Sequence, residues 1–340
     1  MKNTFNTFNT LKHIAATAAA VTVLGLTAVK AQAVEMIVTS EIPLAVNPSP
    51  YIVQLIDELK KRTNGEVQGK YFHASTLFTD KDAIAALGTG SVHMVMPVTS
   101  RLEQLDARFG VASLPFVLNS GKLSNQCFSN AYAKVLSEYL EPKGVKVMGL
   151  LKTADLIFLM KNRDIQKVED LKGQKIRVIS GGVILDAMKS IGASPVTMAA
   201  SELSTALSQG VIDGMMTSPA GWADVVGPQA KFAALFPGMA LATSAVTVDK
   251  KWFDALSPQS RDVVQKTVDE IVARQWKEAA ARDEALIKRM QDQGGTYRVM
   301  PAAEVAKLKT PMVAASANFR KQHAQAIAKV EALEKTCNVQ

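Results

Sequence analysis

The feature that most restricts the fold of this chain is a regular alternation of short apolar runs with amphipathic stretches. After the strand-like run EMIVTS comes SPYIVQLIDELKKRT, in which Ile52, Leu55, Ile56 and Leu59 recur at helical spacing and share one face. Strand-like EVQGKYFH, helix-like TDKDAIAALGTG with Asp80 as its expected cap, and strand-like VHMVMP follow. This order predicts an α/β fold with parallel-rich sheets and right-handed crossovers.

The second half of the chain repeats this order. The stretch ALGTGSVHMVM at residues 86–96 has a counterpart, ALSQGVIDGMM, at residues 206–216, and each follows an equivalent strand and helix. Two similar α/β lobes that close on a ligand are therefore expected. A helix from Pro258 to about Gln291, with Ser257 as its cap, would be roughly 50 Å long and should touch both lobes.

The first residues have the pattern of a secretory signal peptide. Lys2 and Lys12 precede an apolar run over residues 14–29, which ends in the small-x-small sequence Ala31-Gln32-Ala33. A transmembrane anchor is the alternative, but the run is shorter than the ~20 residues that a bilayer needs. We expect residues 1–33 to be removed by cleavage after Ala33 and the mature protein to be periplasmic.

Charge and cysteine content limit the possible functions. The net charge of +8 falls to +5 without the leader lysines, and no Lys/Arg tract or aromatic platform indicates a nucleic-acid partner. Neither the G-x-S-x-G and H-E-x-x-H motifs nor a metal-binding Cys/His spacing is found, so we expect neither an enzyme nor a cofactor or metal site. Cys127 and Cys337 could form one disulfide or remain two free thiols.

Two segments resemble the periplasmic solute-binding proteins of tripartite ATP-independent periplasmic (TRAP) transporters, of the DctP type. They are VEDLKGQKIRV, Val168–Val178, and GASPVTMAASELSTALSQGVIDGMMTSP, Gly192–Pro219, and the similarity extends over most of the mature chain. The resemblance implies that Arg177 grips a ligand carboxylate. A guanidinium suits this role because its planar fork of donors matches the two carboxylate oxygens.

The resemblance also implies an architecture and partners. Lobe I would comprise residues 34–154 and 243–282, and lobe II residues 155–242 and 283–340, with crossing strands and the long helix joining them. The partners would be a small organic acid and the small and large membrane subunits of a TRAP permease. A C4-dicarboxylate or sugar-acid binding protein, or a periplasmic ligand sensor of the same fold, is the alternative.

This chain departs from the family pattern at two positions. Ile157 stands where many members have a second arginine, and Thr217 stands where the family often has an asparagine. A dicarboxylate would then bury one charge without a good partner. We therefore expect a monocarboxylate with an apolar or aromatic part, bound against some of Leu156, Ile157, Phe158, Met215, Met216 and Trp222. Strand alternation prevents the two adjacent methionines from both facing the cleft.

The loops that follow the first-lobe strands supply the remaining candidates. Asn47, Thr99 and Ser100 are expected to orient the ligand through hydrogen bonds. Glu41 is the weakest candidate, because a carboxylate repels an anionic ligand. Arg101 is expected to be a solvated loop residue rather than a second cation in the site.

Overall fold

The computed structural model describes residues 33–44, 46–179, 181–198 and 200–339. Of the expected signal peptide, all but Ala33 lies outside the described residues. The first strand begins directly afterwards, at Val34. In the part of the chain that the structure describes, no helix is long and apolar enough to cross a membrane.

The first sheet has five strands in the order β2-β1-β3-β10-β4. Strand β1 pairs in parallel with β2 and β3, whereas β10 is antiparallel to both β3 and β4. The parallel part of the sheet agrees with the crossovers expected from the sequence. The strands are β1 (Val34–Thr39), β2 (Val67–Phe72), β3 (Met94–Val95), β4 (Val145–Asp155) and β10 (Leu241–Asp249).

Helices pack on this sheet through their apolar faces. In α1 the side chains of Ile52, Leu55 and Leu59 are buried, as their spacing predicts. The expected cap of α2 is wrong, because the hydroxyl of Thr79, and not Asp80, accepts the backbone N–H at the helix start. The helices are α1 (Ser49–Arg62), α2 (Asp80–Ala86), α3 (Ser120–Ser124), α4 (Gln126–Leu140) and α7 (Lys250–Ala255).

The second sheet has six strands in the order β11-β9-β5-β8-β6-β7. Its strands are β5 (Ile157–Met160), β6 (Lys175–Val178), β7 (Ser194–Thr197), β8 (Gly214–Thr217), β9 (Phe232–Leu235) and β11 (Thr296–Val299). Its helices include α5 (Gly182–Ser190), α6 (Leu203–Ser208) and α9 (Ala302–Ala315). Strands β3 and β8, which carry the repeated stretch, therefore belong to different sheets.

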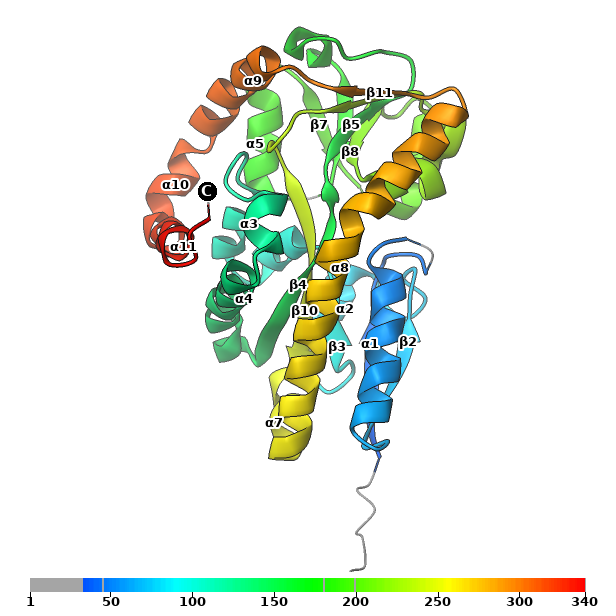
Figure 1. Cartoon of the computed structure of the whole chain (residues 1–340). Helices are drawn as coiled ribbons and strands as arrows, with labels where there is room; N and C mark the ends of the chain where they lie inside the picture. Colours follow the sequence, from blue (N-terminus) through cyan, green and yellow to red (C-terminus); the bar gives the residue numbers. More distant parts are fainter. Residues whose placement is uncertain (1–32, 45, 180, 199, 340) are drawn as a thin grey trace, which may run out of the picture. The chain divides into compact units, whose positions relative to one another are not determined.

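Two strand connections and one long helix join the two sheets (Figure 1). Only Leu156 separates β4 in the first sheet from β5 in the second. Helix α8, Pro258–Asp292, begins after its cap Ser257 and contacts both β4 and β11. The expected two-lobe α/β fold with a spanning helix is thus confirmed, while the residue boundaries of the lobes stay a prediction.

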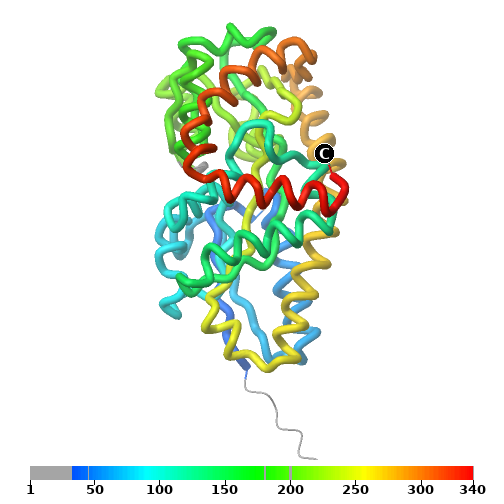
Figure 2. The backbone as a smooth tube through the Cα atoms, turned by 90° about the vertical axis from the view of Figure 1, so that its left-hand side faces the viewer, coloured from blue at the N-terminus to red at the C-terminus, as the bar shows by residue number. Residues whose placement is uncertain are grey.

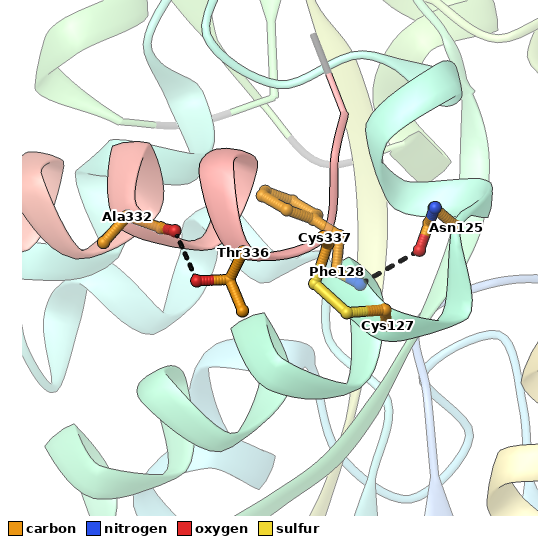
Figure 3. The surroundings of a disulfide bond; sticks show 6 residues. All are labelled: Asn125, Cys127, Phe128, Ala332, Thr336 and Cys337. Atoms are coloured by element: carbon orange, nitrogen blue, oxygen red, sulfur yellow. Dashed lines mark hydrogen bonds between the residues drawn. A yellow bond between two sulfur atoms is a disulfide. The ribbon is translucent and has the colours of Figure 1, made fainter.

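The C-terminal helices form a further connection, on another side of the molecule from α8 (Figure 2). Helix α9 packs against α5, α10 (Ala317–Gln322) follows, and α11 (Ala324–Thr336) packs against α4. A disulfide joins Cys127 in α4 to Cys337 directly after α11, with Cα atoms 5.7 Å apart (Figure 3). Of the two alternatives that the sequence left open, the structure therefore has the bridge.

Candidate functional site

Two adjoining cavities lie between the lobes and share Val98, Leu156 and Ile179 as walls. The first, which we call the arginine cavity, has a volume of about 610 Å³ including its open mouth, and its polar lining is Glu41, Asn47, Thr153, Arg177, Thr217 and Ser218. The second, the apolar cavity, has a volume of about 520 Å³ on the same measure. Its further lining is Ala112, Leu114, Val178, Ile184, Met216, Ala240, Leu241 and Ala242, with the polar residues Thr99, Ser100, Ser113 and Thr243.

Strand alternation divides the side chains of the second sheet between the two cavities. Arg177 and Thr217 line the arginine cavity, whereas their strand neighbours Val178 and Met216 line the apolar cavity. Met215 pairs with Arg177 in the register and packs in a buried cluster instead. The expectation that only one of the two methionines faces the cleft follows from the same alternation.

Arg177 is buried, with 3% of its surface exposed, and its side chain is fixed by backbone carbonyls. Its Nε and Nη2 donate to the carbonyl of Met198 at 3.0 and 2.9 Å, and its Nη1 donates to that of Met216 at 3.3 Å. A guanidinium carries five N–H donors. One N–H on Nη1 and one on Nη2 therefore have no acceptor among the described residues and remain for a ligand.

The charge of Arg177 is also not neutralised by a direct ion pair in the described chain. Burial, together with the nearby positive charge of Arg101, lowers the pKa of Arg177 to about 10, and Glu41 and Glu202 partly offset this. The guanidinium therefore stays protonated at neutral pH. A buried cation with free donors favours an anionic ligand with two acceptor oxygens.

A one-turn π-helix after β8, Gly221–Val226, brings its backbone close to the arginine cavity. The Ser218 hydroxyl accepts the N–H of Gly221 at 2.8 Å. A Cβ on Gly221 would stand 2.1 Å from the Thr217 hydroxyl oxygen, so only glycine permits this close approach. The turn thereby leaves the Thr217 hydroxyl at the cavity wall.

The first lobe contributes a group of charged side chains that the sequence did not indicate as a unit. Arg101 donates from Nη2 to Glu41 at 2.9 Å, and its Nε lies 3.8 Å from Asp80. The side chain of Arg101 is 18% exposed, so the expectation of a solvated loop residue is wrong. Asp80, itself 1% exposed, accepts the backbone N–H of Glu41 at 3.0 Å and so holds the cleft loop.

The buried Asp80 carboxyl should make stability depend on pH. Desolvation, followed by repulsion from Glu41, raises the pKa of Asp80 from 3.8 to about 7. Between these values the folded state retains a proton that the unfolded chain releases, so this group lowers the free energy of unfolding as pH rises, by on the order of 2–4 kcal/mol. Urea unfolding between about pH 4 and pH 7 measures this effect, and in Asp80→Asn the free energy of unfolding should depend less on pH. If the free energy of unfolding fell equally with pH in the wild type and in Asp80→Asn, the Asp80 carboxyl would not be its cause.

Several predicted ligand residues are engaged elsewhere. The Asn47 amide donates to the Lys152 carbonyl at 3.0 Å and accepts from Gln275 at 3.2 Å, which ties the first cleft loop to β4 and α8. The Thr99 hydroxyl donates to the Thr243 carbonyl at 3.0 Å and lines the apolar cavity with Ser100. Asn47 thus lines the arginine cavity, and its hydrogen bonds to Lys152 and Gln275 also hold that wall in place.

The remaining three candidates line neither cavity. Phe158 packs edge-on against Phe236 in the core of the second lobe. Trp222 is fully buried and donates its indole N–H to Ala230. Ile157 shares the sheet face of Thr217 through strand pairing, but lines a third cavity of about 460 Å³ beside α8.

Much of the apolar cavity is formed by residues that no sequence pattern indicates. Ala112, Ser113 and Leu114 come from a 3-10 helix, Ala107–Ser113, and its exit, where no helical or strand periodicity marks them. Leu156 stood among the apolar candidates and is the wall common to both cavities. Leu156 is the single residue between β4 and β5, so the chain passes the cleft at this position as it changes sheets.

Comparisons with known proteins give the same architecture. The C4-dicarboxylate-binding periplasmic protein DctP of Rhodobacter capsulatus is 27% identical over 70% of this chain and 71% of its own. A sugar acid binding protein of Advenella mimigardefordensis in complex with galactonate covers 90% of this chain and 99% of its own, with a TM-score of 0.83 and 20% identity. A Bordetella pertussis solute receptor that binds pyroglutamic acid covers 89% and 100%, with a TM-score of 0.81 and 23% identity.

The chain matches a family of solute-binding proteins. This agrees with the expectation that it is not an enzyme. The match covers residues 51–322 and so includes β6, β8 and most of the cleft described above. With this match the resemblance seen in the sequence is confirmed: the chain belongs to the bacterial extracellular solute-binding proteins of family 7, the DctP family.

Proposed function

We propose that this protein is the solute-binding subunit of a TRAP transporter and captures a monocarboxylate with an apolar or aromatic part. The ligand binds between the lobes, residues 34–154 with 243–282 and residues 155–242 with 283–340, and is delivered to the small and large permease subunits. The mature protein acts in the periplasm after cleavage behind Ala33. Named relatives are periplasmic, which supports this location.

The carboxylate end of the ligand is placed at Arg177. Support comes from the burial of its guanidinium, the two N–H groups without acceptors, and its position in the wall of the arginine cavity. The Thr217 hydroxyl lies on the same wall and can donate a further hydrogen bond. The ligands named for the relatives, a C4-dicarboxylate, galactonate and pyroglutamic acid, all carry a carboxylate.

The observation that carries the apolar part of the proposal is the second cavity next to the first. Eleven of its fifteen lining residues are apolar, and it shares the walls Val98, Leu156 and Ile179 with the arginine cavity. No Lys or Arg stands among its described lining residues. A second carboxylate placed there would be buried without a cationic partner, at a cost of several kcal/mol, whereas an alkyl chain gains about 0.8 kcal/mol per buried methylene.

Filling the apolar cavity tests this placement. Ala112→Leu should lower the affinity for octanoate by about tenfold or more, because the added side chain excludes part of the alkyl chain. The affinity for propanoate, which is too short to enter, should change little. Calorimetric titration measures both, with Ala306→Leu on the exposed surface of α9 as the matched control. Equal octanoate affinity in Ala112→Leu and Ala306→Leu would contradict the placement.

A further inference from the structure

Glu41, the weakest ligand candidate in the sequence, lines the same cavity as Arg177. Its carboxylate is 10% exposed and lines the arginine cavity. One oxygen, Oε1, accepts from Nη2 of Arg101 at 2.9 Å. The other oxygen, Oε2, accepts no hydrogen bond from any described residue.

The position of Glu41 is fixed from two sides. Asp80 accepts its backbone N–H at 3.0 Å, and Arg101 holds its carboxylate from within the first lobe. Arg101 also lies 3.8 Å from Asp80, so its charge is shared between the two carboxylates. Glu41 therefore cannot turn away without breaking its pair with Arg101, and it keeps a negative charge close to the site of an anionic ligand.

A carboxylate with one free oxygen beside an anion site disfavours a plain carboxylic acid. Two carboxylates at close range repel each other, and each loses water as the cleft closes. A hydrogen-bond donor between them offsets part of this cost, because it satisfies the free oxygen of Glu41. Glu41 and Arg177 both line the arginine cavity, so a ligand held by Arg177 lies in the space that Glu41 borders.

We propose that Glu41 selects a ligand with a hydrogen-bond donor on the carbon next to its carboxylate, so that Oε2 accepts from this donor while Arg177 holds the carboxylate. Hydroxyl, ammonium and lactam N–H groups meet this requirement. The inference rests on the proposed function, because it takes the ligand carboxylate to lie at Arg177. It narrows the ligand class from monocarboxylates to their α-hydroxy, α-amino and lactam forms.

The test compares acids of one carbon skeleton. Calorimetric titration of the full mature protein with α-hydroxyhexanoate, α-aminohexanoate and hexanoate should show the first two binding about 10- to 100-fold more tightly than the third, the range expected for a hydrogen bond to a charged group. Equal or tighter binding of hexanoate would overturn the role of Glu41 and leave the proposed function standing. Binding of none of the three would overturn both.

A variant of Glu41 tests whether this side chain causes the preference for α-substituted acids. Glu41→Gln keeps the size of the side chain and removes its charge, so affinity for hexanoate should rise while the preference for α-hydroxyhexanoate falls about tenfold or more. Glu138→Gln, at an exposed carboxylate of α4, is the control and should change neither value. An unchanged preference in Glu41→Gln would contradict the proposal. Matching circular dichroism spectra verify that the variants are folded.

Discussion

Replacing Arg177 by alanine is expected to lower the affinity for hexanoate by about two to three orders of magnitude, the size of effect when one partner of a buried ion pair is lost. The expected loss is large because the arginine cavity has no other cation among its described lining residues. Arg101 is near, but it does not line this cavity, and its charge is shared between Glu41 and Asp80.

Two further variants define the role of Arg177. Arg177→Lys keeps the positive charge but loses the planar fork, so its affinity should lie between those of the wild type and the alanine variant. Arg163→Ala, at an exposed arginine of the same lobe, is the control. Calorimetric titration gives all three values. Wild-type affinity in Arg177→Ala would remove this residue from the binding site.

Removal of the disulfide is expected to lower the free energy of unfolding by about 3–5 kcal/mol. The bridge between Cys127 and Cys337 closes a sequence separation of 210 residues, so its loss gives the unfolded chain a large gain in conformational entropy. It also holds α11 on α4, and both helix ends carry local hydrogen bonds, from Phe128 to Asn125 and from Thr336 to Ala332 (Figure 3).

Urea unfolding of the Cys127→Ser, Cys337→Ser double variant measures this effect. The oxidised wild type should have the higher midpoint, and the reduced wild type should resemble the double variant. A reductant should not change the double variant, which serves as the control for other effects of the reagent. Equal free energies of unfolding with and without the bridge would show that the C-terminal helices are held by packing alone.

The fold could be predicted from sequence where the signal is local. The spacing of Ile52, Leu55 and Leu59, the cap at Ser257 and the alternation in GMMT depend on neighbours within a few residues. The antiparallel insertion of β10 between β3 and β4 could not be predicted, because its pairing is decided by contacts between distant segments. The disulfide was undecided for the same reason.

The site was predictable in part. Arg177 and Thr217 could be named as candidates because a family motif surrounds them, and in the structure both line the arginine cavity. Asp80 was interpreted as a helix cap, since its sequence neighbourhood is that of a helix start. Its actual contacts, with Glu41 and Arg101, come from a different strand end and a different loop. A sequence pattern within one segment does not indicate contacts between side chains from three separate segments.

Hexanoate and adipate, which differ only by a second carboxylate on the same six-carbon chain, test the monocarboxylate site most directly. The apolar cavity next to Arg177 predicts that hexanoate binds at least about 100-fold more tightly, because the second charge of adipate would be buried without a cationic partner. Calorimetric titration of the mature protein with each acid measures the difference. Equal affinities, or tighter binding of adipate, would contradict the proposal of a monocarboxylate site.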